Sequence, residues 1–164
     1  MIKNICFIGL PYAGKSYLGQ AYAKSKNMGF IEIDKIIELK YKKKLHEIIN
    51  DDGINKFMYY ENKIASSLYC HNNLISPGGS IVYSPESMFH IKNILNSKIY
   101  HLYLSFEEFE KRIINLNERG IVMKPGYDVK QLYDERISLC EYYSDKTINV
   151  NNLDKIYKNI NEFN

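Results

Sequence analysis

The sequence has few cysteines, and their arrangement suggests neither a cross-link nor a metal site. Cys6, Cys70 and Cys140 are the only three in 164 residues, they lie far apart, and none belongs to a C-x-x-C pair. An odd number of scattered thiols argues against a disulfide framework, and without paired cysteines a zinc site is not indicated. We therefore expect a protein of the reducing cytoplasm.

Long apolar runs are also missing. The first run, residues 5–8, is only four residues long and leads into a glycine-rich segment, so it is neither a signal-peptide core nor a membrane span. The sequence shows no internal repeat, low-complexity tract or linker. A chain with 45% hydrophobic residues and this length can bury one sizeable core but not two ordinary ones. We expect one domain over residues 1–164 and no membrane partner.

A strong excess of one charge is absent as well. The formal net charge is +3, and the one dense run of lysines, residues 40–44, is interrupted by Tyr41. This run lacks the extended basic face with interleaved aromatic residues that tracks a phosphate backbone. We interpret it as a solvated helix end and expect no nucleic-acid partner. The sequence does not specify an oligomeric state, and a monomer is the simplest expectation.

What the sequence does contain is a phosphate-loop motif. Residues 9–16 read G-L-P-Y-A-G-K-S, with two glycines, a lysine and a hydroxyl at the required spacing. Gly9 and Gly14 would let backbone amides close around phosphate oxygens, Lys15 would neutralise the β- and γ-phosphates, and Ser16 would offer its hydroxyl to Mg²⁺. An apolar run of strand type precedes the motif and a helical pattern follows it. The sequence therefore predicts nucleotide phosphate binding.

Short apolar runs alternate with helix-length segments along the chain. This alternation predicts an α/β fold with a parallel sheet covered by helices on both faces. Strands are expected at residues 5–8, 30–33, 74–75, 99–104 and 147–150. Helices are expected at residues 15–26, 34–40, 45–49, 54–69, 85–95, 106–115, 128–143 and 152–160. Residues 116–127 break the pattern with two glycines and a proline, and we interpret them as a mobile loop.

Two acidic residues close the second predicted strand, in F-I-E-I-D. If the strand continues, Glu32 and Asp34 point the same way, because strand side chains alternate between faces. Ligands of α/β sheets bind at the carboxyl ends of strands, so one carboxylate would hold the Mg²⁺ water shell and the other would orient an acceptor hydroxyl. The alternative is that both only cap the helix that follows.

A second glycine turn, S-P-G-G-S at residues 76–80, follows the third predicted strand. Backbone amides at Gly78 and Gly79 could meet a substrate hydroxyl at close range, or the turn is only a tight connection. Arg119, in the irregular segment, would swing over the β- and γ-phosphates as that segment closes. Arg136, on the next helix, would face the acceptor, although isolated arginines are usually surface residues.

The order of these motifs resembles that of the shikimate kinase family of nucleoside-monophosphate-kinase-like proteins, over nearly the whole chain. The resemblance implies a three-layer P-loop fold with a central five-stranded parallel sheet in the order 2-3-1-4-5, and a mobile lid at about residues 116–127. It implies a small-molecule kinase that phosphorylates a ring hydroxyl of shikimate, with ATP and Mg²⁺ as cofactors.

The resemblance also assigns site residues. The nucleotide would contact the phosphate loop and two arginines, namely Gly9, Pro11, Tyr12, Ala13, Gly14, Lys15, Ser16, Tyr17, Arg112 on the adenine side and Arg119 in the lid. The catalytic residues would be Lys15, Asp34 and Arg119. The acceptor would contact Asp34, Gly78, Gly79, Ser80 and Arg136. The metal would be held by Ser16 and Glu32.

Departures from the family pattern cluster on the acceptor side. The family motif F-R-x-x-E reads F-M-Y-Y-E at residues 57–61, so Met58 stands where an arginine is expected to clamp the shikimate carboxylate. Glu32 replaces an Asp and Ser80 replaces a Gly. Losing one charged hydrogen bond to a carboxylate typically costs about 1.5 to 3 kcal/mol, or roughly 10- to 150-fold in affinity.

The sequence thus predicts ATP-dependent phosphorylation of a hydroxyl on a small anionic metabolite, with shikimate as the leading candidate. Two alternatives stay open. One is a kinase for another hydroxy acid or polyol such as gluconate. The other is a nucleotide-binding regulatory module whose acceptor site has decayed.

Overall fold

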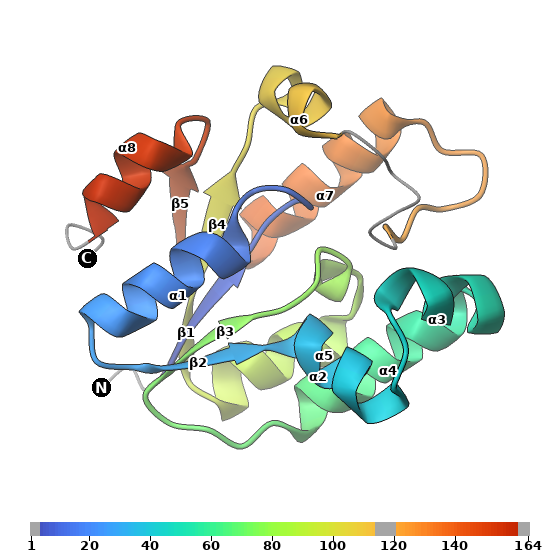
Figure 1. Ribbon diagram of the computed structural model, residues 1–164, viewed down its shortest axis with the longest axis horizontal. Helices are drawn as coiled ribbons and strands as arrows, with labels where there is room; N and C mark the ends of the chain where they lie inside the picture. The colour runs from blue at the N-terminus through green and yellow to red at the C-terminus, as the bar shows by residue number, and fades with distance from the viewer. Residues whose placement is uncertain (1–3, 114–120, 161–164) are drawn as a thin grey trace.

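The five strands in the described part of the chain form one parallel sheet in the order β2-β3-β1-β4-β5 (Figure 1). The structure is a computed structural model that describes residues 4–113 and 121–160. The strands are β1 (Asn4–Ile8), β2 (Gly29–Glu32), β3 (Asn73–Ser76), β4 (Ser97–Tyr103) and β5 (Lys146–Asn149). The predicted α/β class and strand order are confirmed.

Helices connect these strands at the places that the sequence pattern predicts. They are α1 (Lys15–Ser25), α2 (Ile33–Tyr41), α3 (Leu45–Asp52), α4 (Ile54–Ser67), α5 (Pro85–Phe89), α6 (Phe106–Arg112), α7 (Val129–Tyr143) and α8 (Leu153–Lys158). A 3₁₀ turn, η1 (Ile81–Tyr83), precedes α5, and a π-helical turn, η2 (His90–Ile94), follows it. Helical structure therefore runs through nearly all of the predicted helix at residues 85–95, but it changes from an α-helical to a π-helical hydrogen-bond pattern after Phe89.

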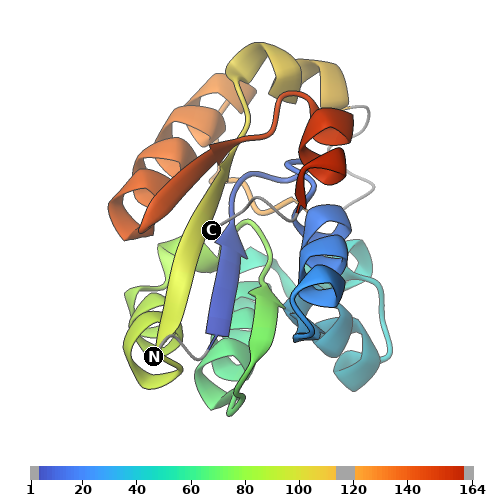
Figure 2. The same ribbon diagram turned by 90° about the vertical axis from the view of Figure 1, so that its left-hand side faces the viewer.

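Helices cover both faces of the sheet, as Figure 2 shows from the side. Along β1, Cys6 and Ile8 point to one face and Phe7 to the other, because strand side chains alternate. The first face packs against α4 and α5, the second packs against α1, α6 and α8, and α7 contributes side chains to both clusters. Since both faces of the sheet are buried along β1, this central strand reads as an almost continuous apolar run.

The boundary between β2 and α2 differs from the prediction. The strand ends at Glu32, and α2 begins at Ile33, so Asp34 lies in the first turn of a helix. Ile33 and Ile37, one helical turn apart, are both fully buried. Their packing takes Ile33 into the helix, and the expectation that Glu32 and Asp34 share one side of a strand is wrong.

The irregular segment predicted at residues 116–127 is described only from residue 121 onward. Residues 121–127 form neither helix nor strand and contain a turn at positions 125 and 126. The lid and its mobility remain predictions, as does the single domain. None of the helices in the described ranges is long and apolar enough to cross a membrane.

We expect Ile75 to be a main determinant of core stability. It is fully buried in β3, where it is paired with Cys6 on one side and Ile31 on the other. Replacing Ile75 with Ala should lower the free energy of unfolding in urea by about 2 to 5 kcal/mol. The control is Leu39→Ala, since Leu39 is 77% exposed and its loss should change the free energy by about 0.5 kcal/mol or less. Equal effects would contradict this assignment of the core.

Candidate active site

A cavity of about 680 Å³ opens at the carboxyl ends of the strands. Its walls come from the loop between β1 and α1, the start of α2, the turn after β3, and α7. Parallel α/β sheets bind ligands at this edge. The predicted site residues that line it are Pro11, Tyr12, Gly14, Lys15, Ser16, Tyr17, Glu32, Asp34, Gly78, Gly79, Ser80 and Arg136.

The loop between β1 and α1 depends on its two glycines. Gly14 has a φ of 84°, in the left-handed region, and a Cβ there would lie 2.7 Å from a methyl carbon of Leu153. A Cβ on Gly9 would lie 2.7 Å from the carbonyl oxygen of Leu102 in β4. The loop therefore needs glycine at both positions. Ala13, also predicted to contact the nucleotide, is buried beneath the loop.

Lys15 folds back over this loop. Its Nζ donates hydrogen bonds to the carbonyl oxygens of Gly9 and Leu10, each at 2.9 Å. Burial lowers the pKa of Lys15 to about 8, although the carboxylate of Asp34 opposes the shift. The ammonium is thus held at the loop, close to where the motif requires it.

Glu32 and Asp34 point to different parts of the cavity. The hydroxyl of Ser16 donates to Oε1 of Glu32 at 2.5 Å, so Glu32 turns toward the phosphate loop. Asp34 turns toward the glycine turn, because its Oδ1 lies 2.7 Å from the position of a Cβ on Gly78. The two side chains diverge because the helix begins at Ile33, between them. The arrangement puts the carboxylate expected at Mg²⁺ and the one expected at the acceptor hydroxyl in different parts of the cavity.

Asp34 is a buried carboxyl group with an unsatisfied oxygen. Its Oδ1 has no hydrogen-bond partner among the described residues. Burial raises the pKa of Asp34 to about 6, although Lys15 opposes the shift. Asp34 is not the residue that caps α2, because that position belongs to Glu32, whose side chain makes no capping hydrogen bond. The interpretation of Asp34 as only a helix cap is therefore not supported.

Arg136 is a buried cation. It is 1% exposed, and one guanidinium nitrogen lies 2.8 Å from the position of a Cβ on Gly79. It donates to the carbonyl oxygen of Val122 and, at 3.4 Å, to the hydroxyl of Tyr83. Arg136 is thus not the surface residue that an isolated arginine usually is, and Gly79 leaves the space for it.

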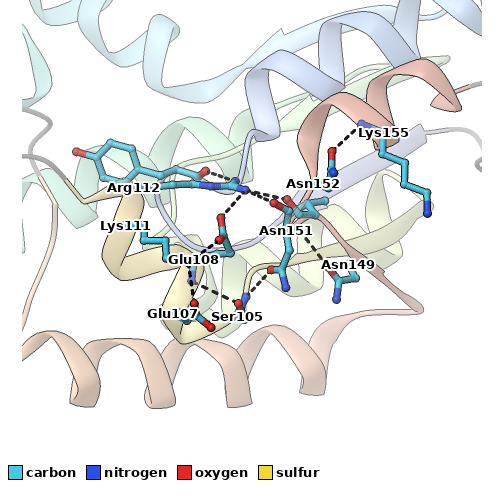
Figure 3. A network of polar contacts seen from close by, with 11 residues as sticks. Ser105, Glu107, Glu108, Lys111, Arg112, Asn149, Asn151, Asn152 and Lys155 are labelled. Atoms are coloured by element: carbon cyan, nitrogen blue, oxygen red, sulfur yellow. Dashed lines mark hydrogen bonds and ion pairs between the residues drawn. The ribbon is translucent and has the colours of Figure 1, made fainter.

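Arg112 lies in a network of polar contacts beside the phosphate loop (Figure 3), and it does not line the cavity. It donates to the carbonyl oxygens of Tyr12 at 3.3 Å, Val150 at 3.1 Å and Asn151 at 2.8 Å, and forms an ion pair with Glu108 at 3.5 Å. The guanidinium therefore ties the phosphate loop to the connection between β5 and α8. Arg119 lies outside the described residues, so its role remains a prediction.

A buried carboxyl group beside the glycine turn, Glu61, was not assigned to the site from the sequence. Glu61 is 2% exposed, accepts a hydrogen bond from the hydroxyl of Ser80 at 2.6 Å, and brings Oε1 to 2.5 Å from the position of a Cβ on Gly78. Its sequence signal is an acidic residue on the apolar side of a helix, between the buried residues Phe57 and Ile64 of α4. A buried carboxyl group in such a stripe usually has a specific partner.

Comparisons with known proteins agree with this geometry. Residues 11–163 match the protein family described as shikimate kinase. A shikimate kinase from Bacillus cereus strain G9842 is 29% identical over 161 residues, which cover 97% of this chain and 94% of that protein. A shikimate kinase from Sulfurihydrogenibium sp. strain YO3AOP1 is 31% identical over 136 residues, covering 82% and 81%.

Solved structures share the fold. Shikimate kinase from Acinetobacter baumannii in complex with shikimate superposes with a TM-score of 0.81 at 19% identity, over 98% of this chain and 91% of that one. Shikimate kinase from Aquifex aeolicus gives a TM-score of 0.75 at 22% identity, over 98% of both chains. With a family match over almost its whole length and a relative above 30% identity, the chain belongs to the shikimate kinase family.

Proposed function

We propose that this protein transfers the γ-phosphoryl group of ATP to a ring hydroxyl of shikimate. The observation that carries the proposal is the shared cavity: Lys15, Asp34 and Arg136 line one space at the strand ends, beside a complete phosphate loop. Phosphoryl transfer needs this combination, because catalysis depends on positioning the reactants and neutralising charge. Family membership favours neither a gluconate-type acceptor nor a decayed binding module.

The nucleotide phosphates would lie in the phosphate loop. Backbone amides at the start of α1 point toward bound phosphate in loops of this type. Lys15, now held by two loop carbonyls, would turn its ammonium to the β- and γ-phosphates. Negative phosphate would also favour its protonated form. Arg112 would support the adenine side, and Arg119 would reach the phosphoryl group from the lid.

Ser16 and Glu32 suit a bound Mg²⁺. Their oxygens are neighbours at 2.5 Å, and magnesium prefers oxygen ligands and keeps several waters. Among the described residues no three His, Cys, Asp or Glu side chains form a metal site by themselves, which is consistent with an ion that relies on nucleotide oxygens. When bound, Mg²⁺ would neutralise charge on the β- and γ-phosphates.

Asp34 would orient the acceptor hydroxyl and accept its proton. Its pKa of about 6 leaves it ionised at neutral pH yet basic enough for this role. Arg136 would bind the anionic group of the acceptor, and the turn at Gly78 and Gly79 would approach its other hydroxyls. Met58, partly buried in α4, leaves Arg136 as the main cation for a carboxylate.

The direct test is ADP release by the purified protein with shikimate, gluconate, homoserine and no acceptor. We expect acceptor-dependent ADP release with shikimate above all others. Release with gluconate alone would replace the acceptor, and nucleotide binding without turnover of any acceptor would favour the regulatory module.

Replacing Lys15 with Met should abolish most turnover, because the ammonium stabilises charge on the transferring group. We expect kcat/KM to fall about 100-fold or more, and calorimetric titration should show weaker ATP binding. The matched control is Lys24→Met, which removes an exposed lysine from the same helix. Unchanged turnover in Lys15→Met would mean that the glycine loop is only structural.

Replacing Asp34 with Asn should act on chemistry more than on nucleotide binding, because Asp34 turns away from the phosphate loop toward Gly78. We expect kcat to fall about 100-fold or more, with KM for ATP within about threefold of wild type. Asp51→Asn, on the exposed face of α3, is the control. Near-normal kcat in Asp34→Asn would remove Asp34 from the mechanism.

Replacing Met58 with Arg tests the acceptor pocket. If the pocket binds shikimate, a second cation for its carboxylate should lower KM for shikimate about 10-fold. In a pocket built for another acceptor, the new guanidinium would be buried without a partner, which costs stability. A less stable variant without shikimate turnover would exclude shikimate and leave the kinase assignment in place.

A further inference from the structure

Glu61 is a buried carboxyl group with only one satisfied oxygen. Its Oε2 accepts the hydroxyl proton of Ser80, whereas its Oε1 has no hydrogen-bond partner among the described residues. Oδ1 of Asp34 is unpartnered in the same way. These two oxygens lie 2.5 and 2.7 Å from one point, the position of a Cβ on Gly78. Two unsatisfied acceptors therefore border the same small space beside the glycine.

Two ionised carboxylates are costly at such a point, because both charges are desolvated and they repel each other. The charged groups that face Glu61 are Asp34 from α2, Lys15 from α1 and Arg136 from α7. Within residues 4–113 and 121–160, no cation forms an ion pair with Glu61. Met58, three residues earlier on α4, brings no charge to this helix face.

A proton on Glu61 removes the conflict. Burial and, to a smaller extent, the nearby Asp34 raise the pKa of Glu61 to about 7, against the opposing effects of Ser80, Arg136 and Lys15. The acid form turns one acceptor into a donor. A protonated Oε1 can donate to Oδ1 of Asp34, and Oε2 still accepts from Ser80. Both unsatisfied oxygens then have partners.

We propose that Glu61 is a positioning residue that works as a neutral carboxylic acid, donating a hydrogen bond to Asp34 while Ser80 anchors its other oxygen. This inference rests on the proposed function, since it gives Asp34 its role at the acceptor hydroxyl. A nucleotide and an anionic acceptor bring more negative charge to the cavity, so they also favour the neutral form. Ser80 thus has a use that a glycine at this position could not supply.

The proposal predicts different results for two substitutions of Glu61. Glutamine keeps both contacts, because its amide nitrogen donates to Asp34 and its carbonyl oxygen accepts from Ser80. Glu61→Gln should therefore retain most of the activity at pH 6.5 that Glu61→Ala loses. We expect Glu61→Ala to lower kcat about 10- to 100-fold, the range for one hydrogen bond to a charged group, with little change in KM for ATP.

The pH dependence of kcat/KM distinguishes a titrating Glu61 from a residue with a merely structural role. In the wild type, kcat/KM for shikimate should fall as the pH rises through about 7, because Glu61 then loses its proton and its hydrogen bond to Asp34. Glutamine does not titrate. The ratio of Glu61→Gln to wild-type kcat/KM should therefore rise about tenfold between pH 6.5 and pH 8. Comparing the two proteins cancels the titration of Lys15, and Glu110→Gln, which changes an exposed residue of α6, should keep the wild-type profile.

The pH dependence of stability tests the protonation of Glu61 without relying on turnover. In the folded protein the pKa of Glu61 is about 7, whereas an ordinary glutamate has a pKa of 4.5. The folded wild type therefore loses stability as the pH rises between these two values. Glu61→Gln lacks this loss. Its unfolding equilibrium constant relative to wild type should therefore fall on the order of 100-fold between pH 4.5 and pH 8.

Two outcomes would overturn the proposal. Equal loss of activity in Glu61→Gln and Glu61→Ala at pH 6.5 would mean that the ionised carboxylate is required. A pH-independent ratio of wild type to Glu61→Gln, in both kcat/KM and stability, would mean that Glu61 does not titrate in this range. Absence of shikimate turnover in the wild type would instead refute the proposed function, and the stability arm would still test the neutral Glu61.

Discussion

The close approach of ionisable side chains to the backbone at Gly78 and Gly79 is the constraint on which the site depends. Asp34 and Glu61 lie against the first glycine, and Arg136 lies against the second. A Cβ at either position would come within 2.8 Å of at least one of these groups. Because neither glycine has a side chain, α2, α4 and α7 can bring two carboxyl groups and one guanidinium to the carboxyl end of β3.

Burial makes these charges interdependent. Desolvation lowers the pKa of Lys15 and raises that of Asp34, and each group partly offsets the shift of the other. Removing one member of such a set leaves the remaining charges uncompensated in a medium where they interact strongly. The same medium benefits phosphoryl transfer, because fixed charges in a dry cavity stabilise developing charge without having to reorganise.

Local sequence patterns predicted the phosphate loop and the positions of most helices and strands. They failed at the junction of β2 and α2, where a period-two pattern places Glu32 and Asp34 on one side. The helix begins one residue earlier than predicted because Ile33 and Ile37, one helical turn apart, are both buried on the same helix face. Glu61 was missed for a related reason, since its burial depends on how α4 meets the turn after β3.

The sequence by itself determined the chemistry of residues 9–16, because the phosphate loop is a contiguous motif whose parts act on one ligand. Tertiary structure alone decided which distant groups join it. Arg112 reaches the carbonyl of Tyr12 across 100 positions of the chain, and Glu61 meets Ser80 across 19. Such contacts follow from the order of strands in the sheet and from the packing of helices on its faces. No short segment of the sequence determines either of these.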